Sequence, residues 1–368
     1  MSPKTFLVEI HLNFETEKNI EIGLKIIESM NVFDFFSSPI GLGHVTRDIA
    51  IANYFQNDSI NFVTGSGAAK ILKNLDFTVS DKYNPPSFEI KNGTLQNSAK
   101  WLWKYYKYYK ECKNISQMVL RADNPNLIIS DEDFASLSIA QEMKIPSILI
   151  TDVLETRFTK GIVSIIEKKM NKSMQKIIEK CDIVIIPEYG KNQDNIKRVG
   201  PIVRQINKSR EELREKFAFT KKTILISIGG TDAGLFLIEE SLKVISEINQ
   251  DIETILVSGP AINKKFENVK NMGFVNNLHE LIFAADLVIS LAGKSTIDEA
   301  NAYGTPAIFI PIKGHFEQED NASKQGFVFN DIKRLKELIL EKIEQKRCQH
   351  DTNGARDASE IIKKLITE

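Results

Sequence analysis

Short apolar runs alternate with longer segments of helical periodicity from Asn31 to the end of the chain. In the first half, the apolar runs predict strands at residues 32–38, 61–64, 127–130, 147–151 and 182–187. Helices are predicted between them, at residues 47–55, 68–75, 136–143 and 162–179. Strands that alternate with helices in this way are typical of an α/β fold with a parallel, doubly wound sheet.

The same alternation starts again at Thr223, with strands predicted at residues 223–227, 254–257, 269–274, 286–291 and 307–310. Two helices are predicted after Gln325, at residues 331–345 and 355–366. Gly200 and Pro201 close the first half, and a helix at residues 208–217 leads into the second. A chain of 368 residues is long enough for two such domains.

Residues 1–30 precede the first strand of this pattern. Residues 6–14 alternate like a strand and residues 17–29 have a helical pattern. Met30 stands directly before the strand at residues 32–38. We expect either an added structural element or an upstream start codon, and a chain that begins at Met30 should fold and work if the extension is dispensable.

The stretch at residues 286–322 carries the largest group of polar side chains at predicted strand ends. We expect a strand with its lead-in at residues 282–291, a helix from Thr296 to about Tyr303, a strand at residues 306–312 and a loop at residues 313–318. Its polar residues are Lys294, Ser295, Thr296, Glu299, His315, Glu317 and Gln318. In an open α/β sheet, ligands bind beyond the carboxyl ends of the strands.

These residue types could bind phosphate and sugar groups. Ser295 and Thr296 open a helix, where free N–H groups and the helix dipole favour a phosphate. Glu299 could accept both hydroxyls of a ribose, and Gln318 offers the donor and acceptor that sugar hydroxyls need. The structural alternative is that Thr296 caps the helix with Glu299 as its capping-box acid, and spacing alone favours that alternative.

The loop at residues 38–48, S-P-I-G-L-G-H-V-T-R-D, joins the first strand to its helix. Gly41 and Gly43 allow close approach of a ligand to the backbone. The loop is not a dinucleotide fingerprint, because Thr46 occupies the third glycine position. Histidine is neutral enough near pH 7 to act as a base. We therefore predict catalysis by His44 ahead of the alternative, in which His44 only shapes the loop.

The loop at residues 227–234 follows the first strand of the second half. Gly229 and Gly230 permit close backbone approach, and Thr231 or Asp232 would cap the next helix. Together they predict a phosphate cradle, with a plain strand-to-helix turn as the alternative. The G-K-S at residues 293–295 is not a P-loop, because that motif needs a glycine at position 288, which is valine.

Two further features have competing interpretations. Asp131, Glu132 and Asp133 follow one predicted strand and Asp152 follows another, where an acid could orient a base or bind acceptor hydroxyls, or simply form a solvated turn. Residues 99–110, A-K-W-L-W-K-Y-Y-K-Y-Y-K, place Trp101, Tyr105 and Tyr108 on one helix face. Aromatic residues beside lysines suit a membrane interface with anionic lipid, and they equally suit a helix that packs its aromatic face on the sheet.

Composition narrows the setting. The net charge of −1 gives no support for nucleic-acid binding. The three cysteines lie far apart, without a metal or disulfide pattern, which favours a cytosolic protein. Hydrophobic content of 42% and charged content of 26% are ordinary for a globular protein. No apolar run approaches the ~18 residues of a membrane span, and the N-terminus does not resemble a signal peptide.

The 286–322 stretch resembles the nucleotide-sugar signature of GT-B glycosyltransferases. The similarity is greatest to the peptidoglycan N-acetylglucosaminyltransferases of glycosyltransferase family 28, with the plant and animal UDP-glycosyltransferases more distant. The matched positions are Gly293, Thr296, Glu299, Gly304, Pro306, Pro311, Glu317, Gln318, Asn321 and Ala322. The G-x-G-H loop at residues 41–44 resembles both that family and the UDP-sugar hydrolase of pseudaminic acid synthesis, which also carries the arginine found here as Arg47.

The sequence departs from these families at one position. Two residues before the motif glycine, the UDP-glycosyltransferases have a histidine that touches the diphosphate, and the peptidoglycan family has an arginine. Leu291 stands there in this chain, and Lys294 is the obvious substitute cation.

The resemblance implies two doubly wound Rossmann-like domains with a cleft between them. We expect an extension at residues 1–30, an acceptor-side domain at residues 31–203, a nucleotide-sugar domain at residues 204–350, and a helix at residues 351–368 that packs back on the first domain. No cofactor or metal is implied.

The implied activity is an inverting transfer from a UDP-sugar, with UDP-N-acetylglucosamine as one candidate donor, to an unknown acceptor, with a lipid-linked acceptor as one candidate. The protein would be cytoplasmic, with peripheral membrane contact through residues 99–110. The expected donor contacts are Gly43, Gly230, Thr231, Gly293, Lys294, Ser295, Thr296, Glu299, Glu317 and Gln318. His44 is the expected catalytic residue, and Arg47, Asp131 and Asp152 are candidates on the acceptor side.

The alternatives are a UDP-sugar hydrolase of the pseudaminic type and a non-catalytic nucleotide-sugar binder. A sugar-nucleotide epimerase is a weaker option on the same fold. The hydrolase is favoured by the loops at residues 41–48 and 229–232, whereas the segment through residues 314–322 matches the transferases better.

Overall fold

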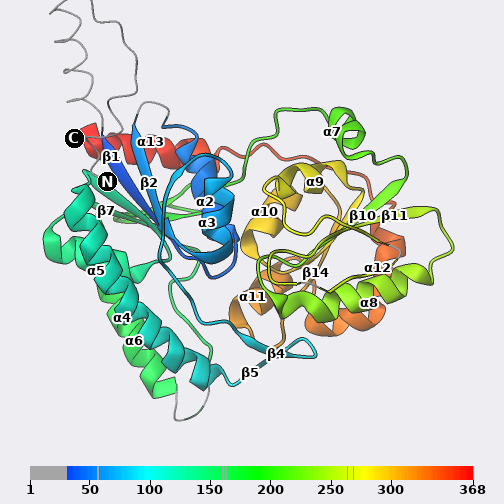
Figure 1. The fold of residues 1–368 in the computed structure, drawn as a ribbon, viewed down its shortest axis with the longest axis horizontal. Helices are drawn as coiled ribbons and strands as arrows, with labels where there is room; N and C mark the ends of the chain where they lie inside the picture. Colours follow the sequence, from blue (N-terminus) through cyan, green and yellow to red (C-terminus); the bar gives the residue numbers. More distant parts are fainter. Residues whose placement is uncertain are drawn as a thin grey trace, which may run out of the picture.

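The computed structural model describes residues 31–55, 58–159, 161, 164–262, 264–267 and 269–367. The elements predicted within residues 1–30 lie outside this range. The described chain contains two α/β domains that lie next to each other, each built around a parallel sheet (Figure 1).

The first sheet has seven strands among the described residues, in the order β3-β2-β1-β6-β7-β8-β9. All of its neighbouring strands are parallel. The strands are β1 (Val32–Ser37), β2 (Ser59–Thr64), β3 (Thr78–Asp81), β6 (Leu127–Asp131), β7 (Ser147–Ile150), β8 (Ile183–Ile186) and β9 (Ile196–Arg198). The central strands are buried on both faces, so their sequences are nearly continuous apolar runs.

Helices cover both faces of this sheet. One face packs against α2 (Gly43–Ala52), α3 (Ser66–Lys73) and the last helix, α13 (Gly354–Thr367). The other face packs against α4 (Ser98–Asp123), α5 (Phe134–Met143) and α6 (Ser164–Ile178). The chain thus returns from the second domain to place α13 beside α2, which Figure 1 shows along the upper edge of the first domain.

The second sheet has the parallel order β12-β11-β10-β13-β14 in the described part of the chain. Its strands are β10 (Lys222–Ser227), β11 (Ile252–Val257), β12 (Lys270–Asn271), β13 (Leu287–Leu291) and β14 (Ala307–Ile310). The helices of this domain are α7 (Arg210–Phe217), α8 (Leu235–Ser246), α9 (Leu278–Ala284), α10 (Lys294–Ala302), α11 (Phe316–Lys324) and α12 (Leu335–Lys342). Short 3-10 helices precede α8 at Asp232–Gly234 and α12 at Phe329–Arg334.

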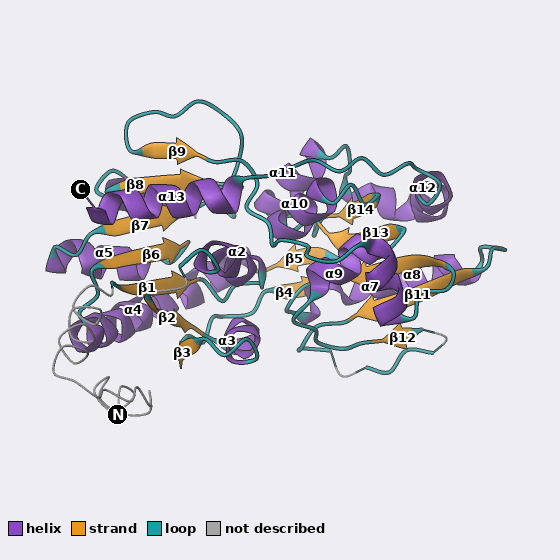
Figure 2. Ribbon diagram, turned by 90° about the horizontal axis from the view of Figure 1, so that it is seen from above, coloured by secondary structure: helices purple, strands orange, loops and turns teal. Residues whose placement is uncertain are grey.

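An antiparallel hairpin of the first domain reaches the second one. β4 (Glu89–Lys91) and β5 (Thr94–Gln96) lie between the two domains in Figure 2. The Leu95 N–H donates to the Lys313 carbonyl at 2.9 Å, and the Lys313 N–H donates to the Gly93 carbonyl at 2.8 Å. Ile90 and Leu95 pack against the core of the second domain. The hairpin therefore fixes the loop that precedes α11, a link that the sequence pattern did not predict.

Several predicted boundaries in the second domain were wrong. Ile282 belongs to α9 rather than to the lead-in of a strand, because an apolar run does not distinguish a short buried helix from a strand. Helix α10 begins at Lys294, two residues before the predicted start, and α11 already begins within the predicted loop, at Phe316. The edge strand predicted at residues 269–274 pairs only at β12, since Gly273 turns the chain with a φ of 63°. Among the described residues, no helix is both long and apolar enough to cross a bilayer.

Candidate functional site

Loops from the two domains meet at the carboxyl ends of the parallel strands. Helix α2 starts at Gly43, just after β1, and α10 starts at Lys294, just after β13. The Ser295 hydroxyl donates to the Gly43 carbonyl at 3.0 Å, so the first turns of the two helices touch. The loop after β10 is also close, because a Cβ added to Gly230 would lie 2.9 Å from the Leu42 side chain. The structure therefore brings three of the predicted glycine loops together.

His44 lies in the first turn of α2 and faces two acids. Its Nδ1 is 2.8 Å from Asp131 Oδ1, and its Nε2 is 3.8 Å from Glu132 Oε2. Burial lowers the pKa of His44, but the charges of Asp131 and Glu132 outweigh burial and raise the pKa to about 10. The expectation of a neutral His44 near pH 7 is therefore wrong for this arrangement, in which the imidazole is a cation.

Arg47 holds the acids in place. Its Nε and Nη2 donate to Asp131 at 2.7 and 2.5 Å, and its Nη1 donates to Asp152 at 3.2 Å. Burial raises the pKa of both acids, but the charges of Arg47 and His44 lower it by a larger amount. Both acids therefore remain ionised. Arg47 and Asp131 are 4% and 0% exposed, so these two acceptor-side candidates lie below the surface of the site. Asp152 is half-buried and lies at the surface of the cleft.

Two glutamates from different domains complete this cluster. Glu132 follows β6, and Glu317 lies in the first turn of α11. Burial and the Asp152 charge raise the pKa of Glu132 to about 8 and that of Glu317 to about 7. Asp152 and Glu317 line a hollow of about 240 Å³ between the domains. The hollow is thus an acidic, partly enclosed space that polar groups of a substrate can occupy.

Ion pairs across the domain boundary flank this hollow. Arg157 pairs with Asp320, and Lys324 pairs with Glu188 at 2.8 Å. All four side chains line the hollow. Since these pairs are largely exposed, each contributes little to stability, about 0–1 kcal/mol.

Lys294, the predicted substitute cation, already has partners. Its ammonium lies 2.5 and 2.6 Å from the carboxylate oxygens of Asp298 and 3.2 Å from the Pro187 carbonyl oxygen. Burial raises the pKa of Asp298 to about 6, although Lys294 opposes that shift. A diphosphate contact by Lys294 therefore requires exchange of the Asp298 carboxylate for the ligand.

Glu299 is also occupied. Its two carboxylate oxygens accept from Arg204 Nε at 2.8 Å and Nη2 at 3.2 Å, and it is 4% exposed. Arg204 in turn donates to the Asn276 carbonyl at 3.0 Å, while its own carbonyl accepts from the Tyr303 hydroxyl at 2.7 Å. Sequence reasoning missed Arg204, since it lies 95 residues from its partner and outside any motif.

The remaining predicted donor residues occupy helix starts. Thr231 caps the 3-10 helix before α8, where its hydroxyl accepts from the Ala233 N–H at 3.4 Å. Thr296 is in the first turn of α10 and does not cap it, because the N-cap is Gly293. Gln318 accepts from the Ile312 N–H at 3.0 Å, which holds the start of α11 against the end of β14.

His315 lies beside this site in an aromatic surround. Its ring is 5.1 Å from Phe88 and 5.5 Å from Phe158 between centroids, so rings of the first domain enclose a residue of the second. Burial lowers the pKa of His315 to about 4, and the imidazole is therefore neutral. This contact and the β4–β5 hairpin hold both sides of the loop before α11.

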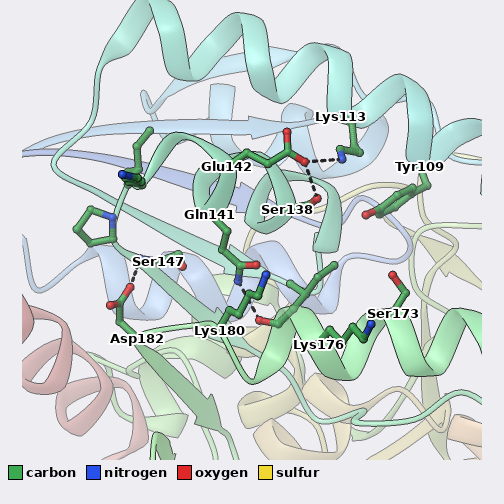
Figure 3. A pocket seen from close by; sticks show the side chains of 14 residues that line it. Tyr109, Lys113, Ser138, Gln141, Glu142, Ser147, Ser173, Lys176, Lys180 and Asp182 are labelled. Carbon is green, nitrogen blue, oxygen red and sulfur yellow. Dashed lines mark hydrogen bonds and ion pairs between the residues drawn. The ribbon is translucent and has the colours of Figure 1, made fainter.

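A larger hollow, of about 790 Å³, lies at the amino ends of β7 and β8 (Figure 3). Lysines at the C-terminal ends of α5 and α6 surround it, where they complement the negative ends of the helix dipoles. Glu142 accepts from Lys113 at 3.1 Å, and Asp182 accepts from the Ser147 N–H at 2.8 Å. Because this hollow is at the opposite edge of the sheet from His44, it is not part of the cleft. No group of three potential metal-ligating side chains is arranged for a metal ion in the described ranges.

Comparisons with known proteins agree with this geometry. Residues 204–360 match the family described as the glycosyltransferase family 28 C-terminal domain. An uncharacterized glycosyltransferase of Methanosarcina acetivorans is 26% identical over 310 residues, which cover 77% of this chain and 80% of the relative. The UDP-N-acetylglucosamine--N-acetylmuramyl-(pentapeptide) pyrophosphoryl-undecaprenol N-acetylglucosamine transferase of Aquifex aeolicus is 24% identical over 280 residues, 73% of this chain and 76% of the relative.

The fold is shared more widely than the sequence. The crystal structure of the glycosyltransferase SnogD from Streptomyces nogalater superposes with a TM-score of 0.57 at 15% identity, over 92% of this chain and all of that one. The predicted two-domain GT-B fold is thus confirmed. The chain is a glycosyltransferase with the GT-B fold, and its residues 204–360 match the C-terminal domain of glycosyltransferase family 28.

Proposed function

We propose that this protein is an inverting glycosyltransferase that uses a UDP-sugar, with UDP-N-acetylglucosamine as the first donor to test. The observation that carries the proposal is the contact between the first turns of α2 and α10 through Ser295 and Gly43. Backbone N–H groups that have no partner within their own helix and the positive ends of both helix dipoles meet there, an arrangement that favours a diphosphate. The name of the Aquifex relative supports the choice of donor.

The donor would lie along the edge of the second domain. Glu299 would bind the ribose once its carboxylate is shared with or released from Arg204, and Glu317 with Gln318 would bind the sugar. Backbone N–H groups and hydroxyls at the helix starts would bind the diphosphate, together with Lys294. The residues of this phosphate site are Gly43, Gly230, Thr231, Gly293, Ser295 and Thr296.

Inversion follows from attack on the side of the sugar opposite to the diphosphate. An acceptor hydroxyl forms a bond to the anomeric carbon while the bond from that carbon to the diphosphate breaks, and UDP leaves with the electron pair. Fixed N–H donors stabilise the charge that develops on UDP, so the proposal does not require a metal ion. His44 would act as a catalytic residue on the acceptor side, with Asp131 and Arg47 fixing its ring.

The acceptor is proposed to be lipid-linked, because α4 offers a surface that suits an anionic membrane. Trp101 is buried, as the packing interpretation expects, but Trp103 and Tyr106 are 59% and 46% exposed. Lys107 lies 3.7 Å from the centre of the Trp103 ring, and Lys110 lies 4.6 Å from that of Tyr106. Aromatic rings beside lysines are typical of helices that rest on anionic bilayers. The protein would then work in the cytoplasm, at the inner face of the membrane.

Vesicle flotation tests the membrane part of the proposal. Wild type should float with phosphatidylglycerol-containing vesicles and not with phosphatidylcholine vesicles. Replacement of Trp103 and Tyr106 by alanine should abolish flotation, whereas replacement of the exposed Tyr189 of the first domain by alanine should not. Equal flotation of the double variant would remove this surface from membrane binding.

UDP release from a panel of UDP-sugars tests the activity. We would compare wild type with His44→Ala, each with and without a membrane-lipid extract. Release that needs both the extract and His44 supports a transferase with a lipid-linked acceptor. Equal, His44-dependent release without extract would replace the transferase by a hydrolase. Binding of UDP without release from any donor would point to a non-catalytic binder.

A further inference from the structure

Transfer of the sugar also requires a place for the proton of the acceptor hydroxyl. His44 does not offer one while its Nδ1 hydrogen bonds to Asp131 and the ring is a cation. On the other side of the ring lies Glu132, whose Oε2 is 3.8 Å from His44 Nε2. The identity of the proton acceptor matters only if the protein is the transferase proposed above, so this inference rests on the proposed function.

Glu132 has a backbone conformation that is uncommon for its residue type. Its φ is +55°, in the left-handed region, directly after β6. Residues other than glycine, asparagine and aspartate rarely adopt this region, and such strain gathers at functional sites. Nearby bonds maintain the conformation, because Glu132 Oε1 accepts from the Thr151 hydroxyl at 3.0 Å and the Asp152 N–H at 3.3 Å.

The two oxygens of the Glu132 carboxylate have different surroundings. Oε1 is held by the loop after β7, so Oε2 is the oxygen that faces the His44 ring. The Glu132 side chain is 18% exposed, in contrast to Asp131, which is fully buried beneath Arg47. Of the two acids that touch His44, Glu132 is therefore the one that a substrate hydroxyl can reach.

Charges from both domains act on Glu132. Asp152 and Glu317 are negative neighbours that favour its protonated form, whereas His44 and Arg47 are cations that oppose them. Burial has the largest effect and also favours the protonated form, so the pKa of Glu132 is raised to about 8. A base whose pKa is near the working pH is the most effective one. Asp131 cannot play this part, since Arg47 and His44 keep its pKa well below the ordinary range despite its burial.

We propose that Glu132 receives the proton of the acceptor hydroxyl, and that His44 remains protonated beside it as an electrostatic partner. As the acceptor oxygen bonds to the anomeric carbon, its O–H bond breaks and the proton moves to Glu132 Oε2. The bond from the anomeric carbon to the diphosphate breaks in the same step, and its electron pair leaves on UDP. The neutral Glu132 then returns its proton to solvent.

The decisive experiment is a pH profile of UDP release from UDP-N-acetylglucosamine with the membrane-lipid extract. Wild type should gain activity as the pH rises, with a midpoint near 8, the pKa of Glu132. Glu132→Gln keeps the size of the side chain, and it should lower kcat by about 10²–10⁴-fold. It should leave the donor KM unchanged and lose this rise with pH. Glu142→Gln removes an exposed charge on α5 and is the matched control, which should behave like wild type.

A second variant separates a catalytic from a structural role. Loss of the His44 charge in His44→Gln should move the midpoint of the remaining activity upward, because His44 lowers the pKa of Glu132. If the wild type is active and Glu132→Gln keeps the same kcat or the same rise of activity with pH, the assignment of Glu132 is overturned while the proposed function stands. An inactive wild type on every donor would reject the proposed function and the proton acceptor with it.

Discussion

Removal of the Arg204 guanidinium should destabilise the second domain because it leaves the Glu299 carboxylate buried without a partner. The two side chains are 8% and 5% exposed, and two hydrogen bonds of 2.8 and 3.2 Å join them. Loss of one member of such a buried pair costs about 3–5 kcal/mol. We expect Arg204→Met to lower the free energy of unfolding by this amount, which includes the lost bond to the Asn276 carbonyl.

The double variant tests the cause. When Glu299 is also replaced by methionine, no buried charge remains without a partner, and an apolar pair of similar volume is often as stable as the ion pair. We therefore expect Arg204→Met with Glu299→Met to recover most of the loss. The two single variants should each be clearly less stable than the double variant, which is the signature of coupling in a double-mutant cycle.

Urea unfolding with two probes gives the measurement. Both tryptophans, Trp101 and Trp103, are in α4, so their fluorescence reports on the first domain, whereas far-ultraviolet circular dichroism reports on both. The variant should shift the dichroism midpoint more than the fluorescence midpoint, since Glu299 belongs to the core edge of the second domain. A double variant as unstable as Arg204→Met would refute the argument that the unpaired carboxylate causes the loss.

Three other perturbations follow from buried or crowded positions. Burial raises the pKa of Asp34 in β1 from 3.8 to about 7, so the folded state holds a proton that the unfolded chain releases. The free energy of unfolding should thus fall as the pH rises from about 4 to about 7. Asp34→Asn should have a higher melting temperature than wild type above neutral pH, but not near pH 4. An increase that is equal at every pH would contradict this. Gly93→Ala should loosen the hairpin, because φ is 70° and the new Cβ would lie 2.7 Å from the Phe329 ring; faster hydrogen exchange of the Lys313 amide checks it, and wild-type protection would count against it. Lys294→Ala should raise the donor KM if its ammonium moves to the diphosphate, and an unchanged KM would remove Lys294 from the site.

The sequence alone determined the architecture because its signals are local. Strands buried on both faces appear as apolar runs, and the helices between them have their own periodicity, so the parallel sheets could be predicted without a structure. The motif at residues 293–322 spans a short part of the chain, and the comparisons support the class of enzyme that it indicated. The predicted glycine loops also come together, because parallel strands place their carboxyl ends at one edge.

The tertiary structure alone decided what those residues face and which charge they carry. His44 meets Asp131 across 87 residues of sequence, and Arg204 meets Glu299 across 95, so neither pair leaves a local pattern. The hairpin that fixes Lys313 is likewise a contact between domains. The charge on His44 follows from acids that folding brings near it, because a pKa depends on burial and neighbouring charges rather than on residue type. Residue types therefore indicated a base at His44, whereas the folded environment moves that role to Glu132 in our proposal.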